Sequence, residues 1–326
     1  MKLRRHALGL TTLGALALWG CGPQDTTPAA GTGDTKAAAG ATKQFTIGLS
    51  QCNLGEPWRV QMNKDISEEA MKHPEIKLIA VDAQNKSETQ QQQVRDLIQR
   101  KVSLIIISPK ESRPLTKPVE EAMGAGIPVI VLDRKLQGDN YTCFIGGDNV
   151  KIGREAGKYM AQLLGGKGDV VELKGLMTST PAKERHDGFM EGIKGSKIRV
   201  VADPDCKWLE GDAQREMNSA LSRFPRIDAV YGHNDPSAHG AYTAARAEGK
   251  GREKQIKFLG IDGLPGEGQR YVKDGILSAT FQYPTGGKDG VLTALKVLNG
   301  EQVEKNITLG TRIFTPDNVS QGGKEL

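Results

Sequence analysis

Three apolar segments of this 326-residue sequence end in side chains that carry charge or form hydrogen bonds. The segment VIVLD ends at Asp133, which Arg134 follows, the segment AVYGHN ends at Asn234, and KFLGID ends at Asp262. A carboxylate accepts hydrogen bonds, a guanidinium donates them, and an amide does both. These groups suit a small molecule with several hydroxyl groups, since each hydroxyl both donates and accepts.

A second set of residues adds flat apolar surfaces and further donors. The chain has three tryptophans, and two of them, Trp58 and Trp208, lie outside the N-terminal segment. An indole face covers the C–H face of a pyranose or furanose ring. Arg59, Arg185 and Gln282 add forked donors and an amide. The alternative for each tryptophan is a place in the hydrophobic core.

The segments around these residues alternate between strand and helix patterns from residue 45 onward. Apolar runs such as FTIGLS, IKLIAVD, SLIIISP and IPVIVLD are continuous, as expected of parallel strands covered on both faces. Helical patterns lie between them at residues 57–72, 86–100 and 115–124. Strands and helices in strict succession predict an α/β fold with doubly wound parallel sheets.

The alternation starts again near residue 150, which indicates a second lobe of the same kind. We expect an N-terminal lobe of residues 44–148 plus 283–313 and a C-terminal lobe of residues 149–282 plus 314–326. The chain then crosses between the lobes three times, near Asp148-Asn149, Gln282 and Phe314-Thr315.

The polar residues after the strands have an explanation in this architecture. Open parallel sheets bind ligands beyond the carboxyl ends of their strands. Two lobes that face each other would therefore gather these residues around one cleft. Simpler interpretations stay open for single positions. Asp133 and Arg134 would form a surface ion pair, and Asn234 with Asp235 would cap the following helix, because both residue types are good N-caps.

The first 43 residues differ from the rest of the chain. Residues 1–20 start with basic residues and continue with an apolar stretch too short to span a bilayer, which is typical of a signal peptide. Their end, LWG followed by Cys21, resembles a bacterial lipobox, so we expect Cys21 to become the lipidated N-terminus. The alternative is simple secretion. Residues 22–43 are rich in Gly, Ala, Thr and Pro, which predicts a flexible tether.

Composition and charge exclude several protein classes. Hydrophobic residues make up 37% of the chain and charged residues 25%, which is not typical of a disordered or membrane-embedded protein. The net charge of +5 falls to +2 without residues 1–20, which is too small to indicate nucleic-acid binding. The spacing of Cys52, Cys143 and Cys206 shows neither a disulfide framework nor a metal pattern, so we expect small buried residues.

Catalytic and metal-binding patterns are weak. His233 and His239 flank a helix start without an evident third ligand, so we expect no metal site. The glycine-containing GGDNVKIG lacks the acidic partner of a nucleotide fingerprint. The sequence shows no Ser-His-Asp order and no pair of acids set up for hydrolysis. We therefore expect neither an enzyme nor a cofactor.

Six motifs follow one another along the sequence, and their combination in this order is specific: PWR, VLDR, KERHDGF, HNDPSAHGA, GIDGLPG and ATFQYPT. Together they resemble the periplasmic sugar-binding proteins of the ribose-binding type, which serve ABC importers. The likeness covers residues 45–315, and the pair Trp58-Arg59 is most similar to the galactofuranose-binding branch. Gly55 and Glu56 stand where ribose-binding members have asparagines, which argues against ribose itself.

The resemblance implies a structure and a set of ligand contacts. It implies the type I periplasmic binding protein fold, with two lobes joined by a three-strand hinge. It places the sugar ring between Trp58 and Trp208. The other contacts that it implies are Arg59, Asp133, Arg134, Arg185, Asn234, Asp262 and Gln282.

Two functions are consistent with this resemblance. The first is a receptor that captures a monosaccharide, closes about its hinge and delivers the sugar to an ABC transporter permease in the membrane. The second is a sensor that presents a sugar or an autoinducer-type ligand to a chemoreceptor or kinase. In both, we expect an exported monomer, anchored by its lipid and facing the periplasm or cell exterior, with no nucleic-acid partner. A DNA-binding repressor needs a head domain where the tether stands.

Overall fold

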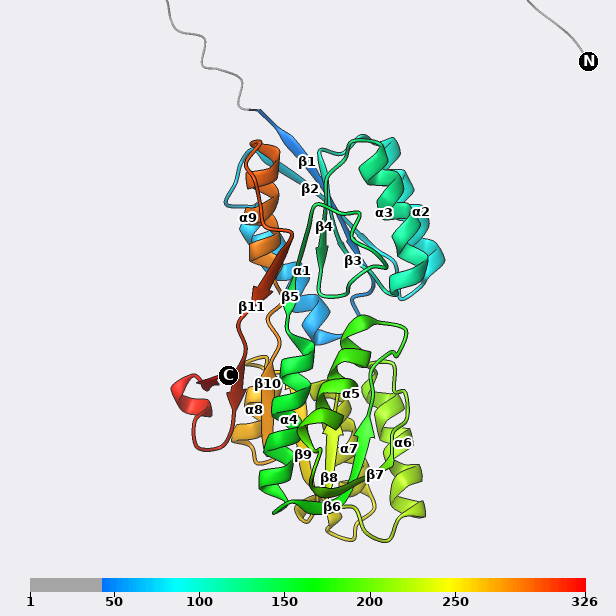
Figure 1. The fold of residues 1–326 in the computed structure, drawn as a ribbon, viewed down its shortest axis with the longest axis vertical. Helices are drawn as coiled ribbons and strands as arrows, with labels where there is room; N and C mark the ends of the chain where they lie inside the picture. Colours follow the sequence, from blue (N-terminus) through cyan, green and yellow to red (C-terminus); the bar gives the residue numbers. More distant parts are fainter. Residues whose placement is uncertain (1–42) are drawn as a thin grey trace, which may run out of the picture. The chain divides into compact units, whose positions relative to one another are not determined.

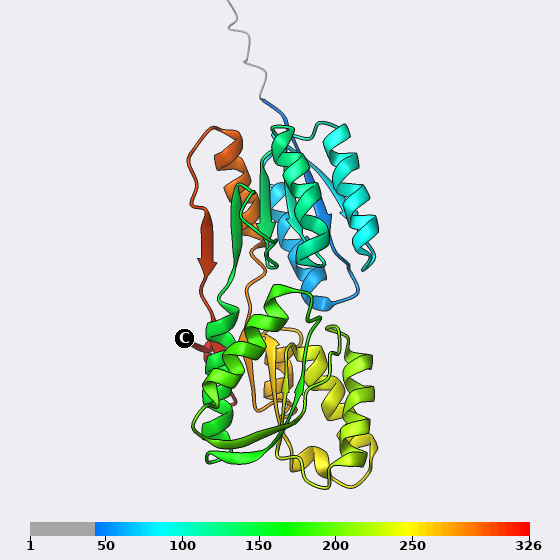
Figure 2. The ribbon, with the colours of Figure 1, turned by 45° about the vertical axis from the view of Figure 1, so that its right-hand side comes forward.

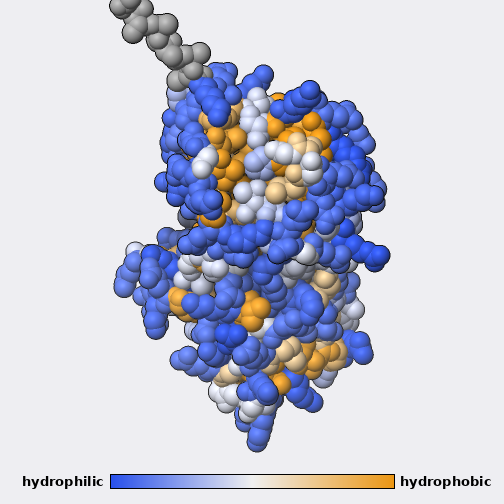
Figure 3. All heavy atoms as spheres, turned by 45° about the horizontal axis from the view of Figure 1, so that its top comes forward, coloured by the Kyte–Doolittle hydropathy of each residue, from blue (hydrophilic) through white to orange (hydrophobic). Residues whose placement is uncertain are grey.

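The computed structural model describes residues 43–326. The predicted signal peptide, Cys21 and all but the last residue of the predicted tether lie outside these residues. Within them the chain forms two sheets, each with helices on both faces (Figure 1). No helix of this described part is long and apolar enough to cross a membrane. Hydrophilic residues cover most of the face shown in Figure 3, with hydrophobic residues visible between them.

The first lobe is built on a six-stranded sheet. Its elements are β1 (Phe45–Gln51), α1 (Pro57–Ala70), β2 (Ile76–Asp82), α2 (Ser87–Gln99), β3 (Leu104–Ser108), α3 (Ser112–Gly124), β4 (Val129–Leu132), β5 (Cys143–Gly147), α9 (Gly287–Leu298) and β11 (Asn306–Leu309). The strand order is β11-β5-β4-β3-β1-β2, and all neighbouring strands are parallel. Helices α1 and α9 pack together, as do α2 and α3 (Figure 2).

Both faces of this sheet are buried, which explains its continuous apolar strands. In β3, Leu104 and Ile106 belong to the hydrophobic cluster that also contains Met62 of α1. The alternate residues Ile105 and Ile107 belong to a second cluster, together with residues of α2 and α3. Because side chains alternate along a strand, a helix layer on each face requires apolar residues at every position.

The second lobe is built on a seven-stranded sheet with the order β13-β12-β10-β9-β8-β6-β7. Its strands are β6 (Lys167–Leu173), β7 (Lys197–Ala202), β8 (Ala229–Gly232), β9 (Lys257–Asp262), β10 (Ala279–Gln282), β12 (Arg312–Phe314) and β13 (Lys324–Glu325). Its α-helices are α4 (Asn149–Leu163), α5 (Thr180–Gly192), α6 (Glu210–Arg223), α7 (Asp235–Ala247) and α8 (Gly268–Lys273), and short 3₁₀ turns lie at Arg252–Lys254 and Val319–Gln321. The predicted α/β fold with two mainly parallel sheets is confirmed.

Two strands at the edge of the second sheet depart from the parallel pattern. Strand β12 pairs antiparallel with β10, and β13 pairs antiparallel with β12. Strands β6 to β10 run toward the first lobe, whereas β12 begins where the chain returns from that lobe. It therefore enters the sheet from the opposite end and must run in the opposite direction.

Three connections join the lobes (Figure 2). The first joins β5 to α4 at Asp148, the second joins β10 to α9 through Tyr283, and the third joins β11 to β12 through Gly310-Thr311. The sequence predicts the third connection near Phe314-Thr315, and this position is wrong. Phe314 already pairs with Thr280 inside the second sheet, so the crossing occurs a few residues earlier.

Helices α4 and α5 approach each other closely because glycines lie at their contact. A Cβ atom on Gly153 would lie 2.3 Å from the carbonyl oxygen of Arg185, and one on Gly188 would lie 2.2 Å from that of Val150. Any larger residue would force the helices apart, since real Cβ contacts are longer than this. The close approach brings Arg185 on α5 next to Asn149 at the start of α4.

Candidate functional site

A cavity between the two lobes gathers most of the residues predicted from the sequence. It contains about 280 Å³ of space not filled by protein atoms, including space that is open to solvent. Eight of the nine predicted residues line it: Trp58, Arg59, Asp133, Arg134, Arg185, Trp208, Asn234 and Asp262. Sequence reasoning did not predict the remaining wall residues, which are Glu56, Pro181 and Tyr283.

The first turn of α1 supplies one wall of the cavity. Pro57 occupies this turn, where its missing N–H costs no hydrogen bond, and the helix start places Trp58 and Arg59 at the cavity. Trp58 Nε1 donates to the backbone carbonyl of Tyr283 over 2.8 Å, and the centroids of the two rings lie 5.3 Å apart. The indole is therefore anchored on the second connection between the lobes.

Asp133 lies between two buried arginines just after β4. Arg59 Nη2 donates to Asp133 Oδ2 over 2.6 Å, and Arg134 Nε lies 3.6 Å from the same oxygen. Burial alone would raise the pKa of Asp133, but the positive charges of Arg59 and Arg134 outweigh it and hold the pKa below its ordinary value. Asp133 is 4% exposed and Arg134 is 2% exposed. The interpretation of this pair as a surface ion pair is therefore wrong.

Arg185 connects three parts of the second lobe. Its Nε donates to Asn149 Oδ1 over 2.9 Å, and its Nη1 donates to the backbone carbonyl of His233 over 2.5 Å. The same Nη1 lies 3.9 Å from Asp262 Oδ1. The guanidinium thus links the first connection between the lobes, at Asn149, to the ends of β8 and β9.

Asp262 is the last residue of β9 and is nearly fully buried. Burial raises its pKa well above the ordinary value, the charge of Arg185 opposes this rise, and the nearby carboxyls of Asp235 and Glu267 add to it. A protonated carboxyl donates a hydrogen bond as well as accepting one, which suits a hydroxyl partner. Asp235 itself accepts from Gly263 N and Thr280 Oγ1 and does not line the cavity.

Trp208 belongs to the second lobe and lines the cavity from that side, whereas Trp58 belongs to the first lobe. The guanidinium carbons of Arg134 and Arg185 lie 5.7 and 5.3 Å from the centre of its ring, within the range of cation–π attraction. Asn234 Nδ2 donates to the carbonyl oxygen of Trp208 over 3.1 Å. Asn234 Oδ1 accepts a hydrogen bond from the backbone N–H of Ser237, so Asn234 caps α7, as the simpler interpretation of this residue expected.

Three buried donors of the cavity residues have no hydrogen-bond partner within residues 43–326. They are Arg59 Nε, Arg134 Nε and Trp208 Nε1. A buried donor that lacks a partner costs about 1–3 kcal/mol. A ligand rich in oxygen atoms would supply acceptors where the protein provides none.

Gln282 is the one predicted residue that does not line the cavity. It borders a different depression, together with Gly310 and Thr311, and its backbone carbonyl accepts from Thr311 Oγ1 over 2.5 Å. Successive side chains of an extended segment point to opposite sides, so Tyr283 takes the cavity side at this connection. The signals for the missed residues were the aromatic after Gln282 and the carboxylate of Glu56 before the helix start.

The buried side chains of Glu172 and His233 form a cluster with the partly exposed His186 next to the cavity wall. His233 Nε2 lies 2.8 Å from Glu172 Oε1, and His186 Nδ1 lies 2.9 Å from Glu172 Oε2. Burial alone would raise the pKa of Glu172, but hydrogen bonds with the two histidines lower it to about 2. His239 does not join this cluster, since it stacks on Tyr271.

The three cysteines within residues 43–326 are small buried residues, as predicted. Each is a free thiol: Cys52, Cys143 and Cys206. The part of the chain that the structure describes also contains no group of three or more His, Cys, Asp and Glu side chains that could hold a metal ion.

Comparison with known proteins gives matches that span both lobes. The family model described as "Periplasmic binding protein domain" matches residues 47–302. The ribose import binding protein RbsB of Bacillus subtilis (strain 168) is 35% identical over 279 residues, which cover 85% of this chain and 89% of that protein. The galactofuranose-binding protein YtfQ of Escherichia coli (strain K12) is 28% identical over 287 residues, covering 85% of this chain and 90% of that protein.

A solved structure agrees with these matches. The fructose-binding periplasmic domain of a hybrid two-component system superposes with a TM-score of 0.82 at 42% identity. The match covers 86% of this chain and 93% of that chain.

Proposed function

We propose that this chain, which belongs to the periplasmic binding protein family, is an extracytoplasmic receptor that binds a monosaccharide and delivers it to an ABC transporter permease. The relatives named above are sugar-binding proteins, which supports a binding role without catalysis. The lobes close about the three connections when the sugar binds, as expected of hinged receptors.

One observation carries this proposal. The cavity between the lobes combines two indole rings with the side chains of three arginines and three carboxyl groups. The indoles cover the apolar faces of a sugar ring, and the charged groups bond its hydroxyls. The unpartnered donors Arg59 Nε, Arg134 Nε and Trp208 Nε1 require acceptors, and hydroxyl oxygens provide them.

A second function is supported by one specific comparison. The structure with 42% identity is the fructose-binding periplasmic domain of a hybrid two-component system, so presentation of a sugar to a kinase is the alternative to transport. Both functions use the same binding chemistry. A pull-down from membranes with sugar-loaded protein separates them, because the transport proposal predicts a permease and the alternative predicts a kinase or chemoreceptor.

A thermal-shift panel tests the binding proposal. The probes are D-ribose, D-fructose, L-arabinose, D-galactose, myo-inositol and xylitol. A sugar at 100 times its Kd stabilises the folded state by about 2.7 kcal/mol and raises Tm accordingly. The Asp262→Asn variant should lose the shift, whereas Asp139→Asn, which alters an exposed residue away from the cavity, should keep it. A panel in which no sugar raises Tm contradicts the proposal, and a sugar that is converted to a product contradicts the non-enzymatic role.

We also propose that the protein is exported and held at the membrane by lipid on Cys21. The basic start, apolar stretch and LWGC sequence of residues 1–21 support this localisation. The Cys21→Ala variant should appear in the soluble fraction after cell fractionation. Retention of this variant in the membrane fraction contradicts lipidation at Cys21.

A further inference from the structure

The residue that lies against the ring of Trp208 is a glycine. A Cβ atom on Gly175, which follows β6, would lie 2.4 Å from three atoms of the Trp208 indole. The φ angle of Gly175 is not positive, so it lies in a range that residues other than glycine also adopt. Only the space taken by the indole requires glycine at this position.

The backbone that carries Trp208 is fixed in place. Lys207 and Trp208 have φ angles of 54° and 72°, which non-glycine residues rarely adopt. Asp205 Oδ1 accepts the backbone N–H of Lys207, and Asn234 Nδ2 donates to the carbonyl of Trp208. Cys206 N also donates to the carbonyl of Lys174, directly before Gly175. Because both segments are held together, the indole has little freedom to withdraw from the glycine.

Gly175 is also held by a buried histidine. The backbone N–H of Gly175 donates to His233 Nδ1 over 3.2 Å. Nδ1 is therefore an acceptor, so the proton of the neutral ring is on Nε2, which donates to Glu172 Oε1 over 2.8 Å. Both side chains are completely buried. This chain of bonds fixes the position of the glycine on which the indole rests.

We propose that Gly175 sets the depth of the cavity by letting the Trp208 ring lie directly on its backbone, with His233 and Glu172 holding Gly175 in position. Trp208 lines the cavity and Gly175 does not, so the indole ring lies between Gly175 and the cavity. An alanine would have to displace the ring by about 1 Å to restore an ordinary contact distance. That displacement moves the ring toward the cavity and favours smaller ligands. The consequence for ligand size rests on the proposed sugar-binding function, whereas the packing itself does not.

A double-mutant cycle tests the packing without any ligand. Gly175→Ala should raise the unfolding equilibrium constant roughly 5- to 100-fold in urea denaturation, as expected of overpacking. In a Trp208→Leu background the same change should raise it less than about twofold, because the ring is gone. Gly211→Ala is the matched control, since a Cβ there meets nothing within 4 Å and its φ is not positive. Equal effects of Gly175→Ala in both backgrounds overturn the proposal.

Two sugars of different size test the effect on the cavity. D-fructose has one more carbon than D-ribose, so Gly175→Ala should raise the Kd ratio of D-fructose to D-ribose about tenfold or more. A Trp58→Phe background leaves Trp208 as the sole tryptophan after residues 1–20 are removed, and its emission should shift in Gly175→Ala. An unchanged ratio together with unchanged emission overturns the depth-setting role. A wild-type protein that binds neither sugar counts against the proposed ligand class. The double-mutant cycle and the Trp208 emission then test, without a ligand, whether Gly175 sets the position of the ring.

Discussion

At the scale of single residues, Asp133 organises the charges of the cavity. It is the acceptor for Arg59 and lies beside Arg134, and its φ of 64° is a left-handed conformation that Asp and Asn tolerate better than most residues. The carboxylate therefore holds two guanidiniums in place, and the buried Nε of each has no hydrogen-bond partner within the described residues.

Replacing Asp133 by Asn keeps the backbone conformation and removes the negative charge. We expect sugar affinity to fall by roughly 2–4 kcal/mol, or about 30- to 1,000-fold, because a charge-assisted bond is lost and two buried arginines face each other without it. Titration calorimetry with a sugar found in the thermal-shift panel measures this. Asp139→Asn serves as the control at an exposed position. An unchanged Kd would show that Asp133 does not contact the ligand.

The His186–Glu172 pair predicts a dependence of stability on pH. Hydrogen bonding to Glu172 raises the pKa of His186 above its ordinary value, although partial burial and Lys174 oppose the rise. The stabilisation from the protonated ring is fully present below the unfolded pKa of about 6.5 and is lost as the pH rises through the higher folded pKa. The stability difference between wild type and His186→Gln should therefore be largest near pH 6 and shrink at alkaline pH.

Urea denaturation at several pH values measures this difference. In a Glu172→Gln background, His186→Gln should no longer produce it, because the partner charge is absent. A stability difference that grows with rising pH would contradict the assignment of the proton to His186.

At the scale of elements, the N-terminus of α7 couples helix stability to the cavity wall. Asn234 accepts from Ser237 N with its Oδ1 and donates to the Trp208 carbonyl with its Nδ2. The two bonds point in different directions, so they can be separated by mutation.

Asn234→Ser should keep most of the cap, whereas Asn234→Ala should lose about 1 kcal/mol of stability from the missing cap, since Ser is a good N-cap and Ala is not. Both variants should weaken sugar binding, because neither side chain provides the amide that holds Trp208. Chemical denaturation and calorimetry give the two quantities. Equal loss of stability in both variants would indicate that the bond to Trp208, and not the cap, stabilises this helix.

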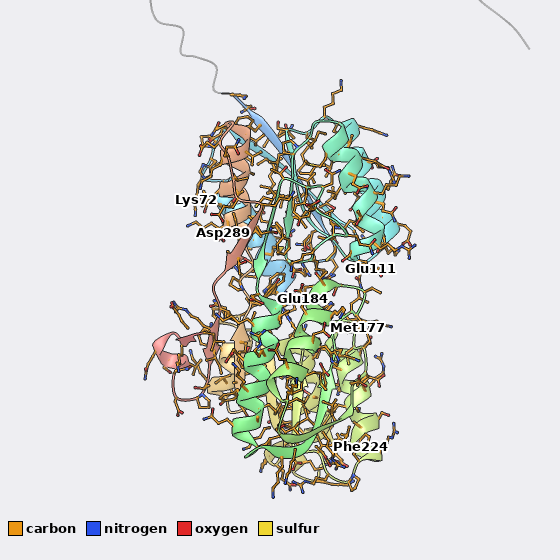
Figure 4. The ribbon with its side chains drawn as sticks, in the orientation of Figure 1. Lys72, Glu111, Met177, Glu184, Phe224 and Asp289 are labelled. Carbon is orange, nitrogen blue, oxygen red and sulfur yellow. The ribbon has the colours of Figure 1, made fainter. Side chains whose placement is uncertain are left out.

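At the scale of the whole molecule, the lobes touch at points outside the cavity. Lys135 of the first lobe donates its backbone N–H to Thr180 Oγ1 over 2.9 Å, and its Nζ lies 2.9 Å from Glu184 Oε1 on α5. Figure 4 shows Glu184 at the level where the two lobes meet. Tyr283 adds a bond at the hinge, since its hydroxyl donates to the carbonyl of Asp133. These contacts favour the arrangement in which the lobes are close, whether or not a sugar is bound.

Removing the Lys135–Glu184 bond should lower the population of the closed arrangement and thereby the apparent affinity. Because both side chains are partly exposed, we expect Lys135→Met to raise Kd only about 1.4- to 5-fold, corresponding to roughly 0.2–1 kcal/mol. Lys183→Met is the control, as Lys183 pairs with Asp187 within the same helix. An affinity loss of equal size in the control would remove the argument for a contact between lobes.

Hinge closure itself is measured by small-angle scattering. A saturating sugar should reduce the radius of gyration, and a variant cross-linked in the open arrangement should show no reduction. A scattering profile unaltered by a sugar that binds in calorimetry would contradict the closing mechanism while leaving the binding proposal intact.

The sequence by itself determined the fold class and most of the cavity residues. Alternating strand and helix patterns report the burial of both sheet faces, and this is a local property that each segment carries in its own composition. Polar residues such as Asp133, Asn234 and Asp262 were found because the carboxyl ends of parallel strands lie at one edge of a sheet. Their position therefore follows from strand direction alone.

Only the tertiary structure decided which distant groups meet. Arg59 and Asp133 lie 74 positions apart, and their bond depends on how α1 and β4 pack. At the second connection, Tyr283 and not Gln282 lines the cavity. Successive side chains of an extended segment point to opposite sides, so a shift of one residue changes which side chain reaches the cavity. The same holds for the reversed direction of β12 and for Gly175 beneath Trp208. Such contacts depend on the packing of separate segments, which no single stretch of sequence encodes.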